Sequence, residues 1–210
     1  MQIPASVKPA RITAYLAVVS LLLIIIGIVG VLVLSYVMGK LSFENNSNAV
    51  FTMRKYVLIS SWFCILVFVC TIIFIPVWTY QICRNVRTGL NGEKLPFQHL
   101  AAWGWFIPIA NFFIPFTSLR RCWSILQANF PVVGLPEKKS IPIQLWQIGF
   151  CGLAITMPLS VLLLKFVTKQ NILVYNITSL VLFLSILLSS ICGIISILQL
   201  LRFEKLAYTK

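Results

Sequence analysis

The stretch ITAYLAVVSLLLIIIGIVGVLVLSYVMG (residues 12–39) carries no charged side chain and is dominated by Leu, Ile and Val. Three more uncharged stretches follow, each of at least 25 residues, at 56–83, 140–164 and 170–201. About 20 apolar residues in a helix cross the hydrocarbon core of a bilayer, and only helices and closed barrels satisfy every backbone group there. The sequence therefore predicts an all-α integral membrane protein with four transmembrane helices. We place these helices at about 15–38, 56–80, 143–164 and 174–200.

The composition supports the same class. The chain has 210 residues, of which 60% are hydrophobic and 10% are charged. These values are ordinary for a small multi-pass membrane protein and unusual for a soluble domain. Four helices and their connections use nearly the whole length, so we expect a single membrane domain over residues 1–210.

The charge is strongly basic, with 17 Lys and Arg against four Glu and no Asp. In a soluble protein this balance would suggest nucleic acid, but here we expect the basic residues to flank the helices beside anionic lipid headgroups, with no nucleic-acid partner. The two tails and the connection between the second and third helices hold twelve of the basic residues, and the other two connections hold five. The positive-inside rule then places both termini and the long connection in the cytoplasm.

The long connection contains an aromatic segment. Residues 96–119 carry no charge, but Pro108 and Pro115 would each break a helix hydrogen bond. A fifth helix here would also leave seven basic residues inside and ten outside. We therefore predict an interfacial or re-entrant segment, in which Asn111 hydrogen-bonds the backbone freed by the prolines.

A helical pattern follows this segment. Leu119, Trp123, Leu126 and Phe130 recur at spacings of four, three and four, which is one face of a helix. This pattern predicts a short amphipathic helix lying on the inner leaflet between the second and third transmembrane helices.

Small residues mark two helix faces. Ser185, Ser189 and Gly193 are spaced by four, and Gly27 and Gly30 lie in the first helix. Small residues at such spacing let transmembrane helices approach closely. The short connection at 165–171 predicts an antiparallel hairpin of the last two helices.

None of the six cysteines falls in an outer connection, so we expect no disulfide framework. Cys83 and Cys122 lie at the cytoplasmic boundary, where they are either small packing residues or palmitoylation sites. Each follows a Phe-Ile-Pro sequence, at 74–76 and 113–115, with the cysteine seven residues after the proline. The match is too short to predict a repeat.

Residues for catalysis or metal binding are scarce. The four predicted spans contain no Asp, Glu, His, Lys or Arg, and the four Glu lie in connections and tail. The only histidine is His99. With Cys122 as nucleophile it is the only candidate catalytic pair, and nothing in the sequence brings the two residues together. We expect no enzyme, no catalytic residue, no cofactor and no metal site.

Two basic clusters flank the aromatic segment, and their residues are Arg84, Arg87, Arg120 and Arg121. They are explained either as topology-setting charge or as a pocket for anionic lipid headgroups, since each basic residue near an anionic surface contributes about 1 kcal/mol.

Several motifs here resemble a known family. They are Trp78-x-x-Gln81-x-x-x-Asn85, the run Gly104-Trp105-Phe106-Ile107-Pro108-Ile109-Ala110-Asn111, then Pro115-Phe116 and Leu119-Arg120-x-x-Trp123. They resemble a bacterial membrane family of unknown function marked by a W-F-I-P-x-x-N-x-x-x-P segment between its second and third spans. The resemblance implies a four-helix fold in the bacterial cytoplasmic membrane and brings no activity. We take eight residues as a candidate structural motif: Trp78, Asn85, Trp105, Phe106, Pro108, Asn111, Pro115 and Trp123.

The leading functional hypothesis is a non-enzymatic membrane protein that binds lipid or a protein partner through its cytoplasmic aromatic and basic loop. The alternative is a small channel or transporter acting as a homo-oligomer, in which residues 108–115 line a pore.

Overall fold

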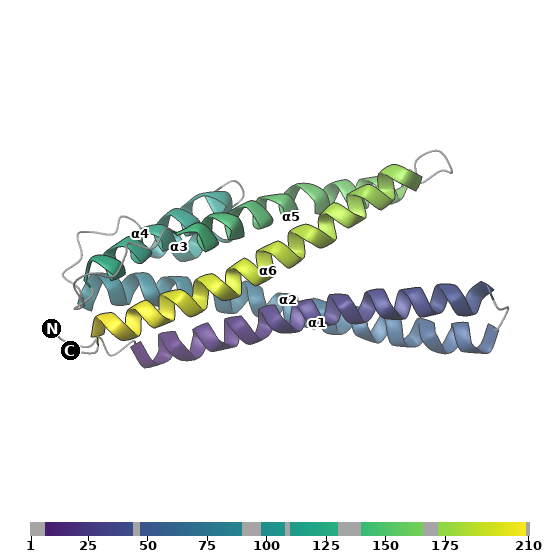
Figure 1. Cartoon of the computed structure of the whole chain (residues 1–210), viewed down its shortest axis with the longest axis horizontal. Coiled ribbons are helices and arrows are strands. Elements are labelled where there is room, and N and C mark those ends of the chain that lie inside the picture. Colours follow the sequence, from purple (N-terminus) through teal and green to yellow (C-terminus); the bar gives the residue numbers. More distant parts are fainter. Residues whose placement is uncertain are drawn as a thin grey trace.

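The structure is a computed structural model that describes residues 7–43, 47–89, 98–107, 110–129, 140–165 and 172–208, and all regular elements among them are helices. Helices α1 (Val7–Phe43) and α2 (Ser47–Gly89) form one antiparallel hairpin, and α5 (Ile141–Lys165) and α6 (Ile172–Tyr208) form a second. Between them lie α3 (Gln98–Trp103), the 3-10 helix η1 (Ala110–Phe112) and α4 (Ile114–Ala128). Figure 1 shows the hairpins lying together near the start of α1 and the end of α6, and diverging toward their turns.

Helices long and apolar enough to cross a membrane are present. Among the described residues they are Val7–Leu34, Ile65–Gly89 and Leu180–Tyr208, and Ile141–Thr156 is a shorter apolar helix. Their outward side chains are largely apolar; Ile26, Leu66 and Ile155, for example, are each more than half exposed. Such extensive apolar exposure is rare in soluble proteins, and it agrees with a multi-pass membrane protein.

The core lies in the half of the molecule where the hairpins meet. Its largest members come from α2, α4, α5 and α6 and include Trp78, Phe116, Leu126, Trp146 and Leu200. In α1, by contrast, no described side chain beyond Leu21 is buried. Packing between the two hairpins is therefore concentrated at the end that carries α3 and α4.

The predicted small-residue face of the last helix is confirmed as a packing surface. A Cβ atom on Gly149 would come within 2.7 Å of the backbone nitrogen of Ser189, and one on Gly152 would come within 2.6 Å of the Ser185 hydroxyl. Glycine in α5 thus permits the close approach of α6. Gly30 differs, because a Cβ there would meet nothing within 4 Å, so it mediates no close contact with the residues that the structure describes.

The aromatic segment is broken, as its prolines predict, into α3, η1 and the start of α4. Gly104 ends α3: its backbone N–H donates to the Leu100 carbonyl oxygen, and a Cβ would lie 2.6 Å from that same oxygen. Pro115 lies in the first turn of α4, where a missing N–H costs no helix bond.

Helix α4 has the predicted amphipathic pattern, but its apolar face does not make the predicted contact with the membrane. Leu119, Trp123 and Leu126 do share one face, but that face is fully buried and packs within the protein core. Phe130, the fourth residue of the pattern, lies outside the described residues. The apolar face of α4 is therefore covered by protein, whereas the sequence pattern alone suggested that the membrane covers it.

Two helices extend beyond the predicted spans. Helix α2 continues past residue 80 to Gly89. Helix α6 continues past residue 200 to Tyr208, so the basic residues assigned to the C-terminal tail, Arg202 and Lys205, are helical.

Candidate functional site

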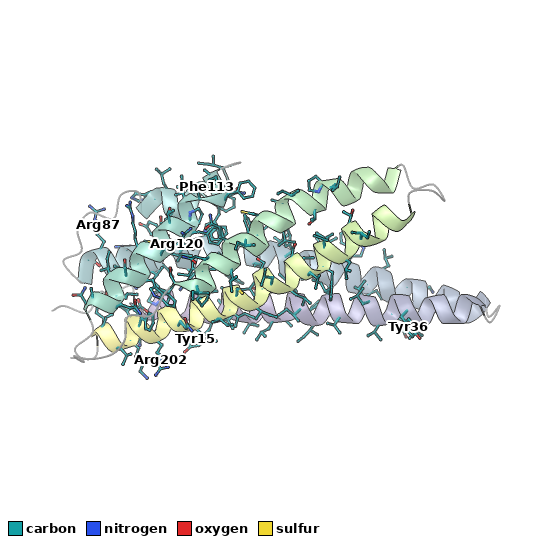
Figure 2. The ribbon with its side chains drawn as sticks, turned by 45° about the horizontal axis from the view of Figure 1, so that its top comes forward. Tyr15, Tyr36, Arg87, Phe113, Arg120 and Arg202 are labelled. Carbon is teal, nitrogen blue, oxygen red and sulfur yellow. The ribbon has the colours of Figure 1, made fainter. Side chains whose placement is uncertain are left out.

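Most of the charged side chains that the structure describes lie at the end of the molecule where α1 begins and where α2 and α6 end; Lys55, near the start of α2, is an exception. Among the described residues, those that are exposed at or near this end are all basic: Lys8, Arg84, Arg87, Arg121, Arg202 and Lys205. Figure 2 shows Arg87 and Arg202 there, both directed away from the helices. We call these six residues the basic surface. Three of the four arginines singled out in the sequence belong to it.

Arg120, the fourth, has a different environment. It is half-buried, and its guanidinium donates a hydrogen bond to the Oε1 of Gln147 on α5. The Gln147 Nε2 in turn donates to the backbone carbonyl oxygen of Phe112, at 2.6 Å. Arg120 therefore ties α4 to α5 and, through Gln147, to η1, and is a structural residue rather than part of the basic surface.

The aromatic segment has a packed side and an open side. Trp105 contacts the rings of Phe116, Trp146 and Phe150, with centroids 5.3 to 5.8 Å away, and its indole Nε1 donates to the Thr79 hydroxyl at 3.3 Å. The open side is formed by side chains that are more than half exposed. These are Trp103 (64%), Phe106 (53%) and Phe113 (58%), the last labelled in Figure 2.

The candidate structural motif is only partly a unit. Trp78, Asn85, Pro115 and Trp123 are buried, and the Trp123 ring meets Phe203 of α6 edge-on at 4.8 Å. Trp105 belongs to the aromatic cluster and Phe106 to the open side, whereas Pro108 lies outside the described residues.

Asn111 was expected to hydrogen-bond the backbone freed by the prolines, and the side-chain donor found on this segment is Gln147. The Oδ1 of Asn111 is buried and accepts no hydrogen bond, and it is Gln147 of α5 that satisfies backbone in this segment. The hydrogen bond that holds this segment therefore comes from a neighbouring helix.

A buried acidic residue was missed by sequence reasoning. Glu204 is 0% exposed, and its Oε1 accepts a hydrogen bond from the Asn85 Nδ2 at 2.8 Å. The Arg11 Nε lies 3.9 Å from Glu204 Oε2, an oxygen that accepts no hydrogen bond. The Tyr208 hydroxyl donates to the Asn85 carbonyl oxygen at 2.6 Å. This cluster joins α1, α2 and α6 inside stretches that are apolar enough to span a membrane.

A sequence signal for Glu204 existed. Ile197, Leu201, Glu204 and Tyr208 are spaced by four, three and four, and neither Gly nor Pro interrupts residues 194–208. The inward face of the last helix therefore continues past residue 200, and Glu204 lies on it. Because the predicted span ended at residue 200, Glu204 was assigned to the C-terminal tail and not to the helix.

Cys83 and Cys122 lie together in the core. Their Sγ atoms are 3.3 Å apart, and both side chains are buried. The hydrogen bond with Cys83, together with burial, raises the pKa of the Cys122 thiol. His99 is exposed, and its ring lies beside that of Tyr80, with centroids 5.5 Å apart and planes tilted by 37°. Among the described residues, the side-chain contact of Cys122 is with Cys83, and no hydrogen bond joins it to His99, the base considered from the sequence.

Metal ligands are not grouped in the described part of the chain, where no three or more His, Cys, Asp or Glu side chains come together.

The profile described as Domain of unknown function (DUF4328) matches residues 44–205, which is more than half of the chain. The chain belongs to the DUF4328 family. The match spans α2 to α6 and so includes the aromatic segment, most of the basic surface, the thiol pair and Glu204. No curated protein and no solved structure matches the chain.

Proposed function

We propose that this DUF4328 protein is a non-enzymatic, four-span protein of a bacterial cytoplasmic membrane, whose cytoplasmic end binds anionic lipid headgroups. The observation that carries the proposal is the segregation of charge. The carboxylate of Glu204 is enclosed by the bundle, whereas the described ionic groups exposed at the same end are all basic. That end therefore presents a positive surface to the membrane boundary.

The expected binding free energies agree with headgroup binding. A basic residue near an anionic surface contributes about 1 kcal/mol, so Arg84, Arg87 and Arg121 together are worth about 3 kcal/mol. Salt screens exposed charges with a Debye length of about 8 Å at physiological ionic strength. Binding by this surface should accordingly weaken at high salt.

The open aromatic side supports an interfacial position for the segment. Trp103 at the end of α3, Phe106 in the turn after it and Phe113 just before α4 are exposed, and aromatic side chains favour the depth of the headgroups. In this arrangement the aromatic rings enter the interface and the basic surface contacts the headgroups. The other side of the segment packs on protein through Trp105, and non-helical backbone at membrane depth needs such protein cover.

Lipid-dependent thermal stability tests the proposal. In mild detergent, added phosphatidylglycerol should raise the melting temperature of the protein more than phosphatidylcholine does. The triple variant Arg84→Gln, Arg87→Gln, Arg121→Gln should lose most of that difference. Lys55→Gln is the matched control, because Lys55 is exposed on α2 but lies toward the other end of the hairpin. Equal stabilisation of the unmodified protein by both lipids would contradict headgroup binding.

A second candidate, a proton- or cation-coupled transporter, is favoured by Glu204 alone. Ionisable groups inside spanning helices are rare and commonly mark transport pathways, and the Glu204 Oε2 accepts no hydrogen bond. Proton or cation flux in proteoliposomes separates the two functions. Flux that disappears in Glu204→Gln supports the transporter, and absence of flux from lipid-stabilised protein supports the first proposal.

A further inference from the structure

The two cysteines that follow the Phe-Ile-Pro sequences meet in the core. Pro76 and Pro115 each precede a cysteine by seven residues, or about two helical turns. Residues seven apart lie on nearly the same face of a helix, so both helices present their cysteine on the face that carries the proline. That shared pattern brings Cys83 of α2 and Cys122 of α4 to a sulfur separation of 3.3 Å. Packing alone does not require two thiols at a single contact.

We propose that Cys83 and Cys122 form a peroxide-sensitive thiol pair that is converted to a disulfide and joins α2 to α4. A disulfide bond is about 2.05 Å long, so the two sulfurs must approach by roughly a further 1.3 Å. The bond would close a connection of 39 residues between the helices, which includes the aromatic segment.

The chemistry balances with hydrogen peroxide as the oxidant. One thiol, reacting as its thiolate, takes an oxygen from peroxide to give a sulfenic acid, and the first water is released. The second sulfur attacks this sulfenic acid, the S–S bond forms, and the hydroxyl leaves as a second water. Two thiols and one peroxide thus give one disulfide and two waters, with two electrons passing from sulfur to oxygen.

The geometry also selects the oxidant. Both side chains are about 99–100% buried, so an oxidant must enter the protein interior to reach either sulfur. A small uncharged peroxide fits such a site better than a bulky charged disulfide such as oxidised glutathione. In a reducing cytoplasm the cross-link would be transient, as cytosolic disulfides that sense oxidants are.

A disulfide between Cys83 and Cys122 would also affect the basic surface. Arg84 follows Cys83 directly, and Arg121 precedes Cys122 directly. A disulfide would fix these two arginines relative to each other on neighbouring helices. The thiol chemistry itself does not depend on lipid binding, so its test requires no lipid.

Peptide mapping under non-reducing conditions tests the proposal on the full chain in detergent. Hydrogen peroxide should yield a peptide that links Cys83 to Cys122, lower the free thiols from six to four, and leave dithiothreitol able to restore all six. Oxidised glutathione at equal concentration should leave the pair reduced. Cys83→Ser and Cys122→Ser should each abolish the linked peptide, and a variant lacking the other four cysteines should retain it.

Three outcomes would overturn the proposal. They are six free thiols after peroxide, separate sulfinic acids at Cys83 or Cys122 without a linked peptide, and equal cross-linking by glutathione disulfide. Peroxide treatment of the denatured chain is the control for the native geometry, since the unfolded protein should give mixed linkages rather than this one.

Discussion

The buried carboxylate of Glu204 is hydrogen-bonded by the side-chain amide of Asn85. Burying a carboxylate is costly unless it is paired and hydrogen-bonded, and here the amide of Asn85 supplies the bond at 2.8 Å while Arg11 lies 3.9 Å away. Because the partners come from α1, α2 and α6, one side-chain cluster determines how three helix ends meet. A single-residue change therefore affects the whole end of the bundle.

A double-mutant cycle should reveal this dependence. Asn85→Leu leaves the buried carboxylate without its amide donor, and Glu204→Leu leaves the amide without its acceptor. Each should lower the free energy of unfolding by about 1–3 kcal/mol. The double variant should lose less than the sum, with a coupling of about 1–2 kcal/mol, measured by unfolding in mixed micelles at increasing SDS. Exposed Thr88→Ala combined with Glu204→Leu is the control. Additive losses at Asn85 and Glu204 would mean that the two side chains act independently.

At the residue scale, the sequence indicates which residues belong to the structural motif better than it indicates which side chains they contact. Asn85, Trp78 and Trp123 were identified by their motif and are indeed buried. Their partners Glu204 and Phe203 lie about 80 to 120 residues further along the chain, and local periodicity carries no information about such pairs. The thiol contact between Cys83 and Cys122 was equally out of reach, although the repeated Phe-Ile-Pro marked both residues.

At the scale of elements, the segment from α3 to α4 is held in place by its neighbours. Its prolines and Gly104 prevent a continuous helix, so backbone groups are left without intrahelical partners. The amide of Gln147 on α5 bonds to both the Phe112 carbonyl oxygen and the Arg120 guanidinium. The broken helix was predictable from the prolines, but the direction in which α4 turns its apolar face was not. An amphipathic pattern states that a face is covered, and only tertiary structure decides whether lipid or protein covers it.

Replacing the Gln147 amide should loosen this segment. Gln147→Leu leaves the Phe112 carbonyl without its donor and Arg120 without its acceptor, at a cost of about 1–3 kcal/mol for each group left unpaired. We expect a clear drop in melting temperature in detergent. Gln144→Leu is the matched control, because Gln144 is exposed one turn earlier on the same helix, and it should melt like the unmodified protein. If the two variants melt alike, the bonds through Gln147 do not hold the segment.

At the scale of the whole molecule, the two hairpins share one packed end and diverge toward the other (Figure 1). The start of α1 and the end of α6 lie at the packed end, together with the basic surface and the segment from α3 to α4. A chain that enters and leaves a bilayer on the same side crosses it an even number of times. This arrangement favours four crossings, with α5 as the partner of α6 in the second hairpin, and it agrees with the distribution of basic residues along the sequence.

Reporter fusions test this topology in the cell. Because the basic residues are concentrated in the two tails and the long connection, the positive-inside rule places the packed end in the cytoplasm. A reporter fused after Lys210 should therefore give a cytoplasmic signal, and one inserted near Asn46, between α1 and α2, should give a signal on the opposite side. Single cysteines at Gln98 and Thr117, in a chain without native cysteines, should both be labelled from the cytoplasmic side. Labelling of those two positions from opposite sides, together with an external signal at Lys210, would mean that the aromatic segment crosses the bilayer as a fifth span, and the basic surface would then no longer lie on one side of the membrane.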